Sequence, residues 1–252
     1  DKKDKIVTII GLDKDLKMLD LALKNIKSVK TNCSIYLKKG NYKDLYLVLK
    51  NHKLKGADGV LLDLGVNSAQ FDEKDRGFSF DSEYLDMRYD NSQKLTAHSV
   101  VNYYSEKDLG NILAKFGEIR GAYAIAKKIV EARPIKTAYE LKQILQNNYR
   151  IRKGKINPAT LVFQALRIEV NNELENLENL LKSIKNTINP GGIVAIISFH
   201  SLEDGLVKNY FRQLVESGEF DYLKEKLITP SEEEISLNQR SRSAKLRIIQ
   251  RL

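Results

Sequence analysis

Two aspartates stand where the strands of an α/β sheet present groups to ligands. Asp63 ends the apolar run Val60–Leu62 and has a glycine two positions on, and Asp13 follows the β-branched run Ile6–Ile10. A carboxylate at the carboxyl end of a parallel strand can hold the hydroxyls of a ribose, an exocyclic amine or a cationic group. Asp63 could instead form an Asx-turn, and Asp13 could cap the next helix.

Aromatic side chains follow the same expected strand ends. Tyr42 comes just after a short strand expected at 34–37 and is placed to stack on an adenine ring, although a buried structural tyrosine is the plainer alternative. Phe78 and Phe80 could sandwich a base drawn out of a nucleic-acid stack. Their spacing of two equally suits a pair of core residues in an extended segment, so both interpretations stay open.

His200 lies directly after the strongly apolar run Ile193–Phe199. An imidazole there could accept a hydrogen from an amine or later take a proton, because imidazole changes its charge near neutral pH. A buried histidine that ties a loop to the sheet is an equally good interpretation. The other histidines, His52 and His98, lie far away in sequence, and a single Cys33 excludes an internal disulfide and a cysteine-rich zinc site. We therefore expect no metal.

The formal net charge of +9 makes a polyanion the expected large partner. Arg150, Arg152 and Lys153 offer phosphate contacts, although a basic run of this kind is usually a solvated loop. The longest apolar run is far too short to span a bilayer, and the first residues form no apolar signal segment. We expect a cytoplasmic protein that works away from membranes.

These residues need a sheet to position them, and the apolar pattern predicts one. Strand-like runs at 6–10, 34–37 and 60–62 alternate with helical periodicity, which indicates parallel strands covered by helices on both faces. Capped helical segments then follow one another between about 105 and 166. Strands at 193–199 and 244–249 resume the sheet. We divide the chain into a core at 1–90, an all-helical insertion at 91–172 and a second part of the core at 173–252.

Longer motifs along the whole chain resemble those of the RsmH (MraW) family. They occur in collinear order, and several are long and unusual, so chance explains them poorly. They are Asp63–Asp72, Arg76–Phe80, Leu85–Asp90, Tyr139–Leu141, Phe163–Ile168, Ser198–Asp204, Pro230–Glu234 and Arg242–Arg247.

The resemblance implies an AdoMet-dependent methyltransferase that modifies N4 of a cytidine in the decoding region of 16S ribosomal RNA, in the small ribosomal subunit. It implies a Rossmann-like class I methyltransferase sheet with an inserted helical subdomain that recognises the substrate. The positions that match AdoMet-binding residues are Asp13, Tyr42, Asp63 and Gln70. The segments around Asn67–Ser68, Phe78–Phe80, Arg88 and Phe199–Ser201 resemble the walls of the target-cytidine pocket. Within them we infer the individual roles ourselves: the catalytic candidates are Asn67, Ser68, His200 and Ser201, and the substrate-binding candidates are Phe78, Phe80 and Arg88, together with Arg150, Arg152 and Lys153 of the basic run.

The sequence also departs from the family. Family members open with a strand and a glycine-rich loop around the methionine part of AdoMet, and no such loop occurs here, so we expect an N-terminal segment to be missing from these 252 residues. Asn67 and Ala69 stand where the family usually has Ser and Pro. A non-catalytic RNA-binding or ribosome-assembly module, and a methyltransferase acting on another substrate, remain the alternatives. A homodimer is left open.

Overall fold

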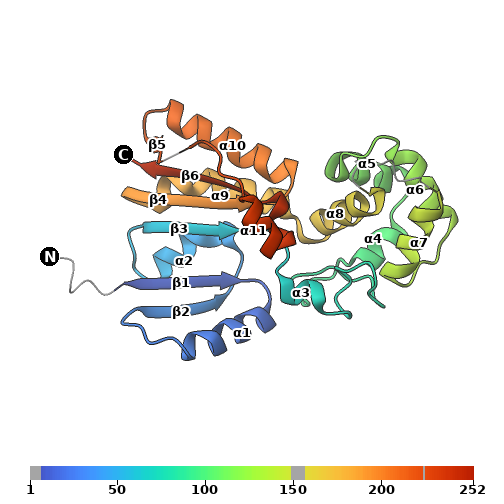
Figure 1. The fold of residues 1–252 in the computed structure, drawn as a ribbon, viewed down its shortest axis with the longest axis horizontal. Helices are drawn as coiled ribbons and strands as arrows, with labels where there is room; N and C mark the ends of the chain where they lie inside the picture. The colour runs from blue at the N-terminus through green and yellow to red at the C-terminus, as the bar shows by residue number, and fades with distance from the viewer. Residues whose placement is uncertain (1–6, 149–156, 224) are drawn as a thin grey trace. The chain divides into compact units, whose positions relative to one another are not determined.

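A computed structural model describes residues 7–148, 157–223 and 225–252 of the chain. The chain divides into two compact units (Figure 1). Unit 1 comprises 1–65 and 174–252, and unit 2 comprises 66–173. All named strands of the described residues belong to unit 1, whereas unit 2 is helical.

The smaller sheet of unit 1 consists of two parallel strands joined by a helix. Strand β1 (Thr8–Asp13) pairs with β2 (Ser34–Lys39), and α1 (Leu16–Lys27) connects them. Parallel strands need such a crossover because the chain must return to the same end of the sheet. After β2 the chain forms the short helices η1 (Tyr42–Asp44) and α2 (Leu45–Asn51).

The larger sheet of unit 1 has four strands in the order β3-β4-β6-β5. Strand β3 is parallel to β4, and β6 runs antiparallel to both of its neighbours. The bounds are β3 (Ala57–Asp63), β4 (Ile188–Ser198), β5 (Phe220–Tyr222) and β6 (Lys245–Arg251). The sequence predicted one parallel sheet, whereas the described strands form two sheets, and the larger one is mixed. There are two sheets because no described strand lies between β1 and β3 to join them. The larger sheet is mixed because β6 is antiparallel to β4 and β5.

Two helices and the larger sheet enclose the apolar core of unit 1. The helices are α9 (Glu173–Thr187), which leads into β4, and α10 (Ser201–Glu216), which follows it. Leu177, Val194 and Phe211 are each at most 1% exposed in this core. By contrast Leu61, in the middle of β3, is 72% exposed. That exposure is unusual, since strands of parallel sheets are normally buried on both faces.

Unit 2 consists of a long loop and six helices in its described residues. Local signals in the sequence predicted several of these helices. Ser105 caps α5 by accepting from the backbone N–H of Asp108, and Asn157 caps α8 with Pro158 in the first turn. The helices are α3 (Ser68–Asp72), α4 (Ala97–Tyr103), α5 (Glu106–Gly117), α6 (Ala122–Glu131), α7 (Ala138–Asn148) and α8 (Pro158–Asn171).

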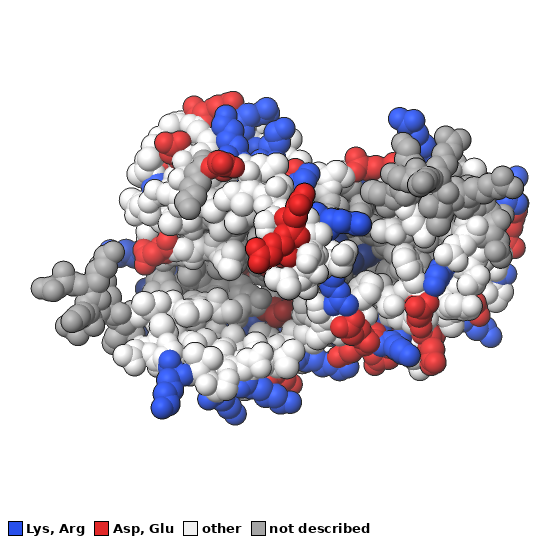
Figure 2. Space-filling model, viewed as in Figure 1, with Lys and Arg blue, Asp and Glu red and all other residues white. Residues whose placement is uncertain are grey.

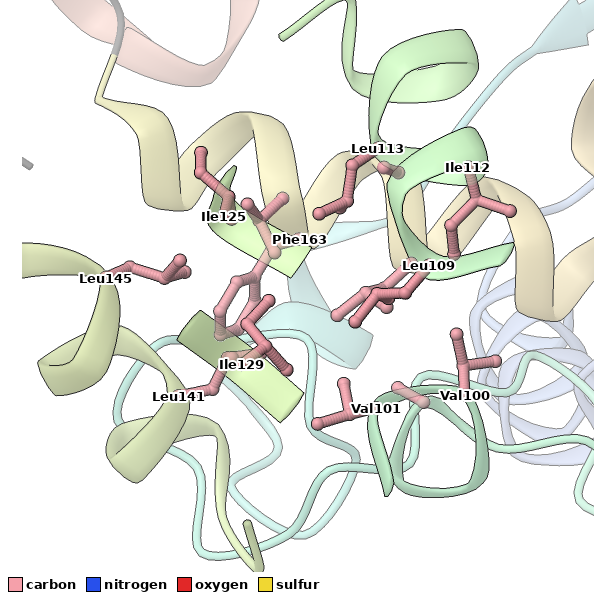
Figure 3. Packing of buried hydrophobic residues seen from close by; sticks show 14 of the residues in the cluster. Val100, Val101, Leu109, Ile112, Leu113, Ile125, Ile129, Leu141, Leu145 and Phe163 are labelled. Atoms are coloured by element: carbon pink, nitrogen blue, oxygen red, sulfur yellow. The ribbon is translucent and has the colours of Figure 1, made fainter. Parts of the chain in front are cut away.

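Helices α4 to α8 contribute to one apolar core in unit 2. Figure 3 shows Phe163 of α8 surrounded by aliphatic side chains from the neighbouring helices. Leu109, Leu113 and Leu141 are fully buried there. The amphipathic periodicity of the sequence therefore specifies a separate hydrophobic core for this unit.

We expect the change Leu141→Ala to destabilise unit 2 by about 2–5 kcal/mol, because it removes a fully buried side chain and leaves a cavity. Hydrogen exchange of the amides in α5, α7 and α8 would measure the loss locally. The matched control is Leu237→Ala, since Leu237 is 82% exposed; it should change stability by less than about 0.5 kcal/mol. Equal effects of the two changes would contradict the burial of Leu141 in this core.

Candidate functional site

The carboxyl ends of the parallel strands in unit 1 place the predicted cofactor-binding residues. The arrows of β1, β2 and β3 point the same way in Figure 1. Asp13 is the last residue of β1, Tyr42 follows the end of β2, and Asp63 is the last residue of β3. Each of the three residues predicted to bind the cofactor from unit 1 therefore stands at a strand's carboxyl end, where open α/β sheets bind ligands.

Asp13 shapes the turn that leads into α1. Its Oδ1 accepts a hydrogen bond of 2.8 Å from the backbone N–H of Asp15. Asp15 itself is the N-cap of α1 and accepts from the backbone N–H of Lys17. The helix cap that the sequence left open for Asp13 is thus provided by Asp15, and Asp13 holds the turn before it.

Tyr42 opens η1 directly after the second strand, with Asn41 as the N-cap. Its ring is half-buried and packs against the apolar cluster of unit 1. Packing of one side of the ring is compatible with stacking of a ligand on another, so the geometry leaves the predicted adenine contact as a prediction.

The carboxylate of Asp63 lies in an electrostatically unfavourable position. Partial burial raises the pKa of Asp63 above its ordinary value, and the negative charge of Glu203 raises it further. Glu203 lies in the first turn of α10 and is only 2% exposed. Perturbed carboxyl groups of this kind concentrate at functional sites, because ligand binding rather than folding favours them.

His200 joins the end of β4 to the start of α10. It is the N-cap residue, and its Nδ1 accepts a hydrogen bond of 3.4 Å from the backbone N–H of Glu203. The Glu203 carboxylate returns to the turn, since its Oε2 accepts from the backbone N–H of Phe199 at 2.9 Å. Ser201, the next candidate, is the first residue of α10 and is exposed. The structure thus brings His200 and Asp63 into one neighbourhood through Glu203.

Glu203 was not among the site residues predicted from the sequence. The available signal was the pattern His200-x-x-Glu203, which has the spacing of a capping box with histidine in place of serine or threonine.

Asp204 anchors the same turn to the last strand. Its Oδ1 accepts a hydrogen bond of 2.7 Å from Nε of Arg247, and its Oδ2 lies 3.2 Å from Nζ of Lys245. Burial opposes ionisation of Asp204, but the hydrogen bonds from Arg247 and Lys245 outweigh it and hold the pKa of this carboxyl below its ordinary value. No local pattern in the sequence reveals this pair, because more than forty residues separate its members.

In unit 2, Asn67 and Gln70 form a reciprocal capping box at α3. Oδ1 of Asn67 accepts from the backbone N–H of Gln70 at 2.9 Å, and Oε1 of Gln70 accepts from the backbone N–H of Asn67 at 3.3 Å. Gln70 is 4% exposed, whereas Ser68 is exposed. The capping box gives Asn67 and Gln70 a structural role, and their predicted ligand contacts stay predictions.

Phe78 and Phe80 both belong to the packing of unit 2. Phe78 is 6% exposed and stacks on Tyr89 with ring centroids 5.6 Å apart. Phe80 is half-buried and meets Phe163 edge-to-face at 4.7 Å. Core packing therefore accounts for the alternation in this segment, and Phe80 retains the more accessible ring for a base.

Arg88 holds the loop in which it lies. Its guanidinium makes a bidentate pair with Asp86 at 2.7 and 2.8 Å and donates to the backbone carbonyls of Asn91 and Gln93. The side chain of Asn171 fastens the same loop by donating to the carbonyl of Met87 and accepting from the N–H of Tyr89, at 2.7 and 2.8 Å. These bonds give Arg88 a positioning role, and its contact with a substrate stays a prediction.

The basic residues Arg150, Arg152 and Lys153 lie outside the described residues. On the face drawn in Figure 2, the basic side chains that the structure describes are interspersed with acidic ones. None of the helices in the described ranges is both long and apolar enough to cross a membrane.

The chain matches one family of known proteins over its whole length. The model of the MraW methylase family matches residues 1–252. The chain is 47% identical to Ribosomal RNA small subunit methyltransferase H of Sulfurihydrogenibium sp. (strain YO3AOP1), with 100% of this chain and 87% of that protein covered. It is 44% identical to the protein of the same name from Thermosipho africanus (strain TCF52B), covering 98% and 84%. The protein of the same name from Mycoplasmopsis synoviae (strain 53) is 42% identical, with 97% of this chain and 84% of that protein covered.

We expect the change Asp63→Asn to raise the free energy of unfolding at pH 7. A raised pKa means that the folded state binds the proton of Asp63 more readily than the unfolded state does. The stability contributed by protonation is complete below the ordinary value of 3.8 and is lost as the pH rises through the raised pKa. The variant lacks this loss, so its advantage in thermal unfolding should grow from acid to neutral pH.

The control is Asp20→Asn, which removes an exposed carboxylate from α1. It should show no such growth. A stability difference for Asp63→Asn that stays constant with pH, or reverses, would contradict the unfavourable position of Asp63.

Proposed function

Because the chain belongs to the MraW methylase family, we propose that it transfers a methyl group from AdoMet to N4 of a cytidine in the decoding region of 16S ribosomal RNA. The coarser activity follows from full-length similarity to the small-subunit enzymes: the chain is a methyltransferase of small-subunit ribosomal RNA. The observation that carries the proposal is the set of carboxylates and a tyrosine at the carboxyl ends of β1, β2 and β3.

The two carboxylates and the tyrosine at these strand ends fit the adenosine part of AdoMet. We assign the ribose hydroxyls to the carboxylate of Asp13, the adenine ring to Tyr42 and the adenine amine to Asp63, by the general rule for nucleotides at strand ends. Gln70 is the fourth proposed contact with AdoMet. AdoMet supplies an electrophilic methyl group on a sulfonium.

The target amine sets the remaining requirements. The lone pair of cytosine N4 is delocalised into the ring, so the site must orient the amine and accept its hydrogens as positive charge develops. We assign this work to the oxygens of Asn67, Ser68 and Ser201, and to the turn that holds His200. Ser68 and Ser201 are both exposed residues.

We assign RNA recognition to the helical insertion at 91–172. The charge of +9 favours a polyanion, and Arg150, Arg152 and Lys153 are the proposed phosphate contacts. Phe80 and Arg88 are the proposed contacts near the base, and Phe78 supports them from the core. The partner is 16S ribosomal RNA as it lies in the small subunit.

The proposed fold is a class I sheet in which a further strand lies between β1 and β3. Among the described strands, β1 pairs only with β2 and β3 pairs only with β4, which leaves one edge of each for another strand. The apolar side chains of Leu61 and Ile9 are 72% and 45% exposed on these two strands. The relatives are longer than this chain, which covers 87% and 84% of two of them.

The function is tested with the complete gene product, labelled AdoMet and small ribosomal subunits that lack this methylation. We expect label in N4-methylated cytidine after digestion to nucleosides. Asp63→Asn should weaken AdoMet binding about 10- to 100-fold, since it removes a charged hydrogen-bond acceptor. Label only in DNA or protein would change the substrate, and cofactor binding without any transfer would favour the non-catalytic alternative.

The additional strand is tested with Leu61→Lys in two lengths of chain. In residues 1–252 the change should alter stability by less than about 0.5 kcal/mol, because the site is exposed. In the complete gene product the same change should cost more than about 2 kcal/mol, because the added segment would bury the charge. Equal tolerance in both chains would contradict the proposed segment.

A further inference from the structure

The turn between β4 and α10 contains a buried carboxylate that the assigned roles do not use. Glu203 is 2% exposed, and its Oε2 accepts from the backbone N–H of Phe199 at 2.9 Å. A carboxylate in such surroundings must be stabilised by donors and by favourable dipoles. Its place in the first turn of the long helix α10 supplies part of that stabilisation, because the helix dipole favours negative charge there.

The same turn defines the state of His200. Its Nδ1 accepts the backbone N–H of Glu203, and a ring nitrogen that accepts a hydrogen bond carries no proton. The proton of the neutral ring therefore belongs on Nε2. That atom lies 3.2 Å from Oε1 of Glu203, and the His200 side chain is 9% exposed. Within the described residues Nε2 makes no well-aligned hydrogen bond, and its contact with Oε1 of Glu203 is therefore electrostatic.

We propose that Glu203 is a positioning residue that holds His200 as the neutral tautomer with its proton on Nε2, and so fixes the turn formed by Phe199, His200 and Ser201. Glu203 touches this turn at both ends, through its carboxylate at Phe199 and through its backbone N–H at His200. The ring itself is held by the backbone N–H at Nδ1 and by Oε1 of Glu203 near Nε2. A neutral imidazole without such neighbours exchanges between two tautomers.

The position of Glu203 also connects the turn with the proposed cofactor site. The charge of Glu203 acts on Asp63, whose pKa it raises in addition to the effect of burial. The charge of one buried carboxylate thus acts on Asp63, the residue assigned to the adenine amine, while the same carboxylate accepts a hydrogen bond from Phe199. The role of the turn in catalysis rests on the proposed methyl transfer. The tautomer proposed for His200 does not depend on it.

This arrangement refines the chemical role of His200. Since Nδ1 caps α10 and Nε2 carries the proton, the ring has no free basic nitrogen to take the proton from the target amine. His200 then acts by holding the turn.

The test is nitrogen NMR of the imidazole rings in the full chain labelled at histidine. The chain has only three histidines, so the signals of His200 are identified by their loss in His200→Gln. We expect His200 to show the two distinct nitrogen shifts of a fixed tautomer with the proton on Nε2. A proton on Nδ1, or the averaged shifts of a ring in tautomer exchange, would overturn the proposal without any variant of Glu203.

The variant Glu203→Gln tests the cause. Its amide oxygen can still accept from Phe199, but its NH2 group faces Nε2 with a donor instead of an acceptor. We expect the tautomer with the proton on Nδ1 to become populated and the cap of α10 to weaken. The control is Glu216→Gln on the same helix, since Glu216 is exposed and should leave the His200 signals unchanged. An unaltered tautomer in a folded Glu203→Gln protein would overturn the proposal.

Kinetics of the complete gene product connect the turn with the reaction. Glu203→Gln should lower kcat about 10- to 100-fold, because small misplacement of reacting groups has effects of this size. KM for AdoMet should change by less than about threefold, in contrast to Asp63→Asn. Wild-type protein that transfers no methyl group would contradict the proposed function but not the tautomer. Normal kcat in Glu203→Gln, with an active wild type, would overturn the positioning role.

Discussion

The parallel pairing of β3 with β4 is the constraint on which the site in unit 1 depends. Its register sets Asp63 opposite Ile197, and the backbone N–H of Leu64 continues the ladder to the carbonyl of Ile197 at 3.0 Å. A shift by one residue would turn every side chain of β3 to the other face of the sheet. The pairing therefore determines that Asp63 and the turn at His200 reach the same edge.

The helix that follows β4 adds a second constraint at that edge. Two consecutive acidic residues in its first turn make different contacts. Glu203 closes the turn locally, and Asp204 ties the helix to Arg247 and Lys245 of β6. A buried ion pair with several hydrogen bonds contributes little net stability, but it disfavours any other arrangement of the two elements. The site thus depends on charged side chains whose burial costs free energy, but whose hydrogen bonds favour one arrangement of α10 and β6.

The sequence alone predicted those features that depend on residues close together in the chain. The caps at Ser105 and Asn157 are local, so the helices that begin there were found. The split of the strands into two sheets was not foreseen, because pairing joins residues far apart in the chain. The alternation of Phe78 and Phe80 suited both a core and a base pocket, and only packing against Tyr89 and Phe163 favours the core.

Within the candidate site the limits were similar. The strand-end positions of Asp13, Tyr42 and Asp63 followed from the apolar runs before them. The role of Glu203 depends on a turn whose geometry the sequence did not specify, although the spacing from His200 was a usable signal. The loop bonds of Arg88 to carbonyl groups are invisible in a sequence, since every residue has a carbonyl.

The division of the chain into units has a consequence for the order of synthesis. Unit 2 is one continuous segment, 66–173, whereas unit 1 needs both 1–65 and 174–252. During translation the helical unit can fold as soon as its own residues have left the ribosome, while β3 waits for β4, and β4 waits for β6. The nascent chain thus holds a finished helical unit while the edge of β3 that will pair with β4 is still open.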